Sequence, residues 1–147
     1  MITVQQVYDM AIMLMNEQDD ATGATNSSEL DGYQSRALAL VNILVSDLYY
    51  LSDNTDLLSA AKPVPPLLSA FTDGIDLDDR LCVNVLPYGL AGHLFVGEND
   101  DASTTFLNLY YTLKKGYGKS KPTAKVAVTN VYGTLCRLAR GESDADS

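Results

Sequence analysis

The chain has 147 residues, of which 46% are hydrophobic and 20% charged, a balance typical of one folded domain and not of a disordered chain. Its formal net charge of −9 opposes general binding to nucleic acid or to an anionic membrane. Cys82 and Cys136 lie far apart in the sequence, so we expect reduced, buried thiols and no disulfide framework. We also expect no signal peptide and no transmembrane segment, and assembly in a cytoplasm, because the chain lacks a basic and apolar leader and any apolar run near ~20 residues.

The charge is distributed unevenly along the chain. Residues 1–113 contain sixteen acidic and three basic residues, a balance of −13. Residues 114–140 contain seven bases and no acid, and residues 141–147 contribute −3. We therefore divide the chain into a helical body (1–115), a basic hinge with an extended arm (116–140), and a disordered acidic tail (141–147).

The first segment is predicted to be an amphipathic helix over 3–16. Thr3 followed by Gln6 is a capping-box pattern that opens it. Its apolar residues are spaced for one buried face, with Met10 and Met15 at the edge, and that face consists of Val4, Val7, Ala11 and Leu14. The polar residues 17–29 that follow predict a loop.

A second amphipathic helix is predicted over 31–50, with Asp31 as its cap. Its apolar stripe consists of Tyr33, Ala37, Leu40, Val41, Leu44 and Leu48. Residues 51–75 then predict irregular chain, because the prolines between 63 and 66 remove backbone donors and exclude a helix there. We expect this long loop to lie against the body or a neighbour through its apolar side chains, which are Leu57, Leu58, Leu67, Leu68 and Phe71.

Two further helices complete the predicted bundle. The third covers 76–96, starts at aspartates that suit a helix N-terminus, and is expected to kink at Pro87. In it, Gly89 and Gly92 leave room for another helix to approach closely. The fourth covers 100–115, is expected to end at Gly116, and turns Ala102, Phe106, Leu109, Tyr110 and Leu113 inward. The residues expected to pack the core of the bundle are Leu40, Leu44, Leu81, Val85, Leu90, Phe106 and Leu109.

After the fourth helix, residues 116–122 predict a flexible basic hinge. Residues 125–131 alternate as a strand does, and residues 131–140 fit either a short helix or extended chain. The predicted fold class is therefore mainly α. It is a compact bundle of about four helices with a long Pro-containing loop and an extended, strand-like C-terminal arm.

Several patterns resemble catalytic or ligand sites but lack residues that those sites require. Residues 116–120 resemble the end of a phosphate-binding loop, yet Leu113 stands where the motif needs a glycine. His93 is the only histidine, which disfavours a zinc site, and we expect it to be partly buried. The aspartates between 73 and 79 do not match a calcium loop and are better explained as helix caps. We therefore expect a protein that is not an enzyme and has no catalytic, cofactor-binding or metal-binding residues.

The basic arm permits two interpretations. Its lysines, with Tyr117, can contact nucleic-acid phosphates, or they can dock on the acidic body of another copy. The second is favoured, because DNA that approached the arm would also meet repulsion from the body; a solvated arm without a partner stays open. The candidate contact residues are Lys114, Lys115, Lys119, Lys121, Lys125, Val126, Val128 and Tyr132.

Six short motifs follow one another along the chain in a distinctive order. They are Val7–Ala11 (VYDMA), Leu77–Cys82 (LDDRLC), Val85–Leu94 (VLPYGLAGHL), Gly97–Asn99 (GEN), Phe106–Tyr110 (FLNLY) and Val131–Gly133 (VYG). In this order they resemble the small head–tail connector (adaptor, or head-completion) proteins of tailed bacteriophages and prophages. The basic hinge and the segment 134–140 depart from the family pattern.

This resemblance implies a four-helix body whose copies form a homo-oligomeric ring beneath the portal. The ring would join the DNA-filled head to the next neck or tail component in the virion and would let DNA pass without specific binding. Its partners would be the portal protein and that neck or tail component, with no membrane involved and with assembly in the host cytoplasm. A tail-completion factor, a small nucleic-acid-binding regulatory module that uses the arm, and a small enzyme remain as alternatives.

Overall fold

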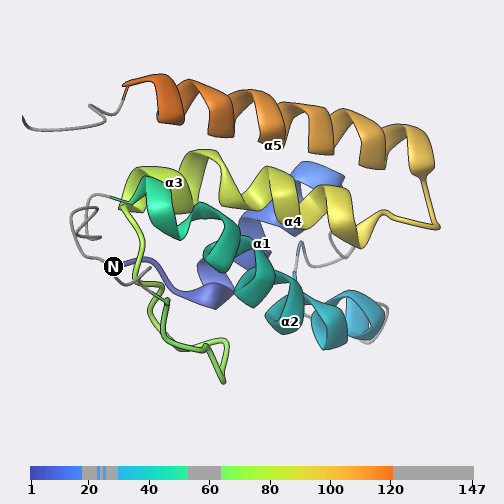
Figure 1. The fold of residues 1–147 in the computed structure, drawn as a ribbon. Helices are drawn as coiled ribbons and strands as arrows, with labels where there is room; N and C mark the ends of the chain where they lie inside the picture. The colour runs from blue at the N-terminus through green and yellow to red at the C-terminus, as the bar shows by residue number, and fades with distance from the viewer. Residues whose placement is uncertain (18–22, 24, 26–29, 53–63, 121–147) are drawn as a thin grey trace, which may run out of the picture.

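The computed structural model describes residues 1–17, 23, 25, 30–52 and 64–120, and for residues 119 and 120 it describes the backbone alone. These residues are mainly helical, which confirms the predicted fold class (Figure 1). The elements are α1 (Val4–Met15), α2 (Asp31–Leu48), the one-turn 3-10 helix η2 (Tyr49–Leu51), α3 (Asp79–Asn84), α4 (Leu86–Leu94) and α5 (Asp100–Ser120). The strand-like segment predicted over 125–131 and the acidic tail lie outside the described residues.

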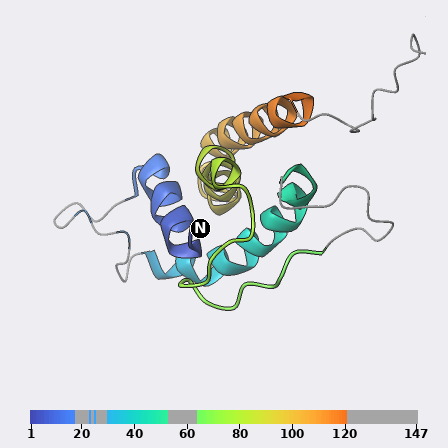
Figure 2. The same cartoon turned by 90° about the vertical axis from the view of Figure 1, so that its left-hand side faces the viewer.

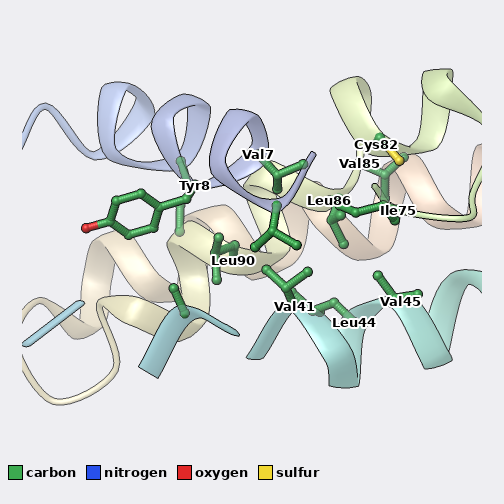
Figure 3. Packing of buried hydrophobic residues seen from close by; sticks show 14 of the residues in the cluster. Val7, Tyr8, Val41, Leu44, Val45, Ile75, Cys82, Val85, Leu86 and Leu90 are labelled. Atoms are coloured by element: carbon green, nitrogen blue, oxygen red, sulfur yellow. The ribbon is translucent and has the colours of Figure 1, made fainter. Parts of the chain in front are cut away.

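Helix α4 is the centre of the bundle. It contacts α1, α2 and α5, and Figure 2 looks along its axis with these three helices arranged around it. Seven of its nine residues are buried, because the sequence is apolar on every side of the helix. Figure 3 shows Val7 of α1, Val41 and Leu44 of α2 and Leu90 of α4 pointing toward one another.

The N-terminal end of α1 agrees with the prediction from the sequence, whereas the burial at its C-terminal end does not. Thr3 accepts a hydrogen bond from the backbone of Gln6, whose side chain accepts one from the backbone of Thr3, so the capping box is confirmed. Leu14, predicted to be buried, is 38% exposed, and Met15, predicted at the edge, is buried. The reason is that no described segment covers that side of α1. At α2, Leu30 and not Asp31 is the N-cap, and Asp31 lies in the first turn.

The predicted third helix is two helices that lie end to end. Asp78 caps α3 by accepting a hydrogen bond from the backbone of Arg80. Regular helical geometry is interrupted at Val85, whose φ of −119° is far from the usual helical value of about −63°. Pro87 lies in the first turn of α4, where its missing N–H leaves no bond unmade. The expected kink is therefore a break, placed so that the proline starts a helix and does not interrupt one.

Residues 71–75 are tied to the start of the chain by backbone hydrogen bonds. Val4 N donates to Asp73 O (3.1 Å), Gln5 N to Phe71 O (2.9 Å), and Ile75 N to Ile2 O (2.8 Å). The Asn42 side chain on α2 fixes Leu68 through its backbone N–H and carbonyl, both at 2.9 Å.

The long loop therefore packs on the body as predicted, through the buried Leu68 and the partly buried Phe71. Leu67 is 84% exposed and is the exception. Leu57 and Leu58 lie outside the described residues.

Most of the predicted core residues are buried. Leu44, Leu81, Val85 and Leu90 are at most 2% exposed, while Leu40 and Phe106 are partly buried and pack against the core. Leu109 is the error: it is 43% exposed, because α5 meets α4 through Tyr110 and Ser103 and leaves Leu109 at the edge of that contact. Cys82 is fully buried as expected, and this burial, with Asp79 and Asp78 nearby, raises the pKa of its thiol to about 12. Cys136 is outside the described residues.

Helix α5 does not end at Gly116 but continues to Ser120. Tyr117 is partly buried against the core and makes two hydrogen bonds to α3, accepting from Asn84 Nδ2 (3.3 Å) and donating to the carbonyl of Arg80 (3.4 Å). This packing outweighs the cost of about 1 kcal/mol for each glycine inside a helix. The hinge prediction is therefore wrong for residues 116–120, and the segment that resembled a phosphate-binding loop is helical.

Candidate functional site

Helix α5 carries opposite charges near its two ends. Asp100 and Asp101 occupy its first turn, and Lys114 and Lys115 lie toward its C-terminal end. With 21 residues, the helix is about 30 Å long. Asp100 and Asp101 are thus separated from Lys114 and Lys115 by most of the length of α5, which runs along the molecule (Figure 1).

Lys114 is paired within its own chain. Its Nζ lies 2.6 Å from Asp47 Oδ1 on α2, and Tyr110 donates a hydrogen bond of 2.6 Å to Asp47 Oδ2. Partial burial raises the pKa of Asp47, but these two bonds outweigh it and hold that pKa below its ordinary value. Burial, followed by the bond to Asp47, raises the pKa of the Tyr110 phenol. Lys114, predicted to face a partner, therefore also fastens α5 to α2.

A groove of about 400 Å³ lies beside this pair, between the end of α2 and α5. Its lining residues are Tyr50, Tyr111, Lys114, Lys115 and Gly118. Both tyrosines and Lys115 are exposed, and Lys115 makes no ion pair with any described residue. Lys114 Nζ lies 5.7 Å from the centre of the Tyr50 ring, within cation–π range. Chemically, the groove suits a carboxylate or a phosphate beside a flat apolar group.

The structure brings together only part of the predicted contact set. Lys114 and Lys115 both line the groove, and the backbone of Lys119 is part of the same helix, α5. Lys121, Lys125, Val126, Val128 and Tyr132 lie outside the described residues. Tyr50 and Tyr111 were missed, although the paired tyrosines at 49–50 and 110–111 were a usable signal, since one tyrosine of each pair must leave the buried face of its helix.

The other polar residues that the sequence singled out serve the fold. Asp73 accepts backbone hydrogen bonds from Ser69 (2.7 Å) and Ala70 (2.9 Å), which lower its pKa, and Asp78 caps α3. His93 is partly buried on α4 as expected. In the part of the chain that the structure describes, no three His, Cys, Asp or Glu side chains are grouped so as to hold a metal ion.

No protein-family model, curated protein or solved structure matches the chain. Within the described ranges, no helix combines the length and the apolar character needed to cross a membrane.

Proposed function

We propose that the protein is a structural neck component of a tailed bacteriophage or prophage, and that its copies form a ring between the portal and the tail through which DNA passes. The observation that carries the proposal is the separation of charge along one chain, with −13 in residues 1–113 and seven bases without an acid in residues 114–140. The order of the motifs, which resembles that of head–tail connector proteins, supports the same assignment.

The charge separation favours contacts between copies. A basic surface on one copy and an acidic surface on the next make a heterologous, head-to-tail contact, and such contacts close into a ring when the rotation permits. Asp100 and Asp101 at one end of α5, and Lys115 near the other, present such a pair of surfaces on the folded body. An acidic wall would also repel DNA, so that DNA slides along the channel and is not held.

Two truncations test this function. The first ends the chain at Ser120, because removing residues 116–120 as well would take away Tyr117 and its packing. The second ends at Arg140 and removes only the acidic tail. The protein ending at Ser120 should keep its helical circular dichroism but lose ring formation or portal binding, measured by mass photometry and negative-stain electron microscopy. The protein ending at Arg140 should assemble as the full chain does.

Assembly that is unchanged after truncation at Ser120 would exclude the arm from the ring contact. A full chain that forms no ring, alone or mixed with the portal of the same phage, would refute the neck assignment. Salt-sensitive DNA binding by the full chain, lost on truncation at Ser120, would instead identify the nucleic-acid-binding module. A portal and a major capsid gene upstream, with tail genes downstream, would support the neck assignment independently.

A further inference from the structure

An apolar groove of about 300 Å³ lies between α1 and the α3–α4 pair. Its lining residues are Met10, Met13, Leu14, Val83, Pro87 and Tyr88. Three of them are well exposed for apolar side chains, Met13 at 55%, Val83 at 43% and Leu14 at 38%. Apolar walls bind the water in such a groove poorly. Its filling by an apolar segment is therefore favourable.

The same apolar surface continues onto α5. The Tyr88 ring lies 6.4 Å from the Phe106 ring, and Leu109 follows Phe106 by three residues, on the same side of the helix. Leu14 and Leu109 are the two residues that the apolar periodicity of α1 and α5 placed in the core and that are instead exposed. Both residues continue the apolar face of their helix, but no described segment covers them. We name this surface, from Met13 and Leu14 through Val83 and Tyr88 to Leu109, the α1–α5 groove.

We propose that the α1–α5 groove binds residues 126–138 of a neighbouring copy, an inference that rests on the proposed ring. Eight of these thirteen residues are apolar, none is acidic, and one, Arg137, is basic. The segment is therefore the apolar part of the basic arm, and the groove belongs to a body whose sequence carries −13. Charge attracts the arm to the body, and the apolar side chains determine where on the body it binds.

The course of α5 favours a neighbouring copy over the same chain. In Figure 2, α1 lies on one side of the bundle, and α5 leans away from it toward its C-terminal end. The chain therefore leaves α5 on the side remote from α1. When the arm of each copy occupies the groove of the next, one contact is repeated from copy to copy, as a closed ring requires.

Single substitutions in the full chain test the groove. Met13→Glu and Leu109→Glu place a charge in the contact, and because both side chains are exposed, the fold should tolerate either. Ile43→Glu is the matched control, since Ile43 is 63% exposed on α2 and does not line the groove. The two groove variants should weaken self-association at least tenfold in sedimentation velocity, and the control should associate as wild type does.

A mixing experiment identifies the occupant. Leu109→Glu has a defective groove and an intact arm, whereas Val128→Glu has an intact groove and a defective arm. At a concentration where wild type assembles and neither variant does so alone, an equimolar mixture should form one-to-one dimers, because a single intact contact remains. Wild-type assembly by the groove variants would overturn the groove inference and leave the ring standing. Heterodimers without wild-type rings would uphold the inference and refute the ring. A mixture that stays monomeric while Leu109→Glu exposes its own arm to protease would show docking within one chain, which overturns the neighbouring-copy assignment.

Discussion

The close packing of α4 on α5 makes a quantitative prediction at Gly92. A Cβ atom added there would lie 2.8 Å from Leu107 Cγ and 3.1 Å from the backbone nitrogen of Leu107. Both distances are shorter than van der Waals contact, and the backbone of α5 cannot move aside as a flexible side chain can. Gly116 is the matched control, because it too lies inside a helix but no atom of the described residues stands within 4 Å of its added Cβ.

The two substitutions to alanine should differ in their effect on the free energy of unfolding. Replacing a glycine inside a helix by alanine stabilises by about 1 kcal/mol in both cases. At Gly92 the added methyl group also overpacks the contact, at a cost of about 1–3 kcal/mol. Gly116→Ala should therefore raise the free energy of unfolding by about 1 kcal/mol, whereas Gly92→Ala should leave it unchanged or lower it by up to about 2 kcal/mol.

Urea denaturation followed by circular dichroism at 222 nm measures this difference. The midpoints should separate without a change in slope, and the melting temperatures should differ by roughly 2–4 °C for each kcal/mol. If Gly92→Ala is as stable as Gly116→Ala, the close approach of α4 and α5 is wrong, and with it the reason for the glycines in α4.

Three further predictions concern titratable groups. Asp47→Asn should lower the free energy of unfolding at neutral pH by about 1 kcal/mol, the size of a half-exposed charged hydrogen-bond pair. Because folding depresses the pKa of Asp47, the difference between the variant and wild type in urea denaturation should vanish as the pH falls below about 4. Burial raises the pKa of Tyr8 to about 12 and also raises that of Tyr110. The free energy of unfolding should therefore hold up to about pH 10, the pKa of an unfolded tyrosine, and fall above it, with phenolate absorbance at 295 nm appearing on unfolding. Titration of every tyrosine near pH 10 without unfolding would contradict the burial of these two. Tyr8→Phe should leave thermal stability unchanged or raise it by about 1 kcal/mol, since the buried hydroxyl has no hydrogen-bond partner among the described residues, and a loss above 1 kcal/mol would show a partner outside them.

The structure agrees with the sequence-based predictions where neighbouring helices cover one face of a helix. The capping box at Thr3, the stripe of α2 and the stripe of α1 as far as Ala11 were predictable, because spacing and caps are local properties of the chain. The role of Gly89 and Gly92 was predictable in the same way, since small residues inside an apolar helix allow a second helix to approach closely.

The errors arose where distant residues decide the local structure. Periodicity could place Leu14 and Leu109 on an apolar face but could not show whether another segment covers that face. The end of α5 was misplaced because Tyr117 gains its contacts from α3, more than thirty residues earlier in the chain. The pairing of Lys114 with Asp47 was hidden for the same reason, since charge counts along a sequence do not show which charges meet.

The backbone bonds between residues 2–5 and 71–75 also have a consequence for synthesis. The start of α1 is held by partners that leave the ribosome about seventy residues later, roughly 4–15 s at ordinary rates of translation. Until then the apolar face of α1 also lacks the central helix on which Val7 and Tyr8 pack, since α4 follows the same residues. The helices can therefore pack together only late in translation, and the apolar face of α1 stays uncovered until then. Apolar surface that stays exposed for this time makes the nascent chain prone to aggregation.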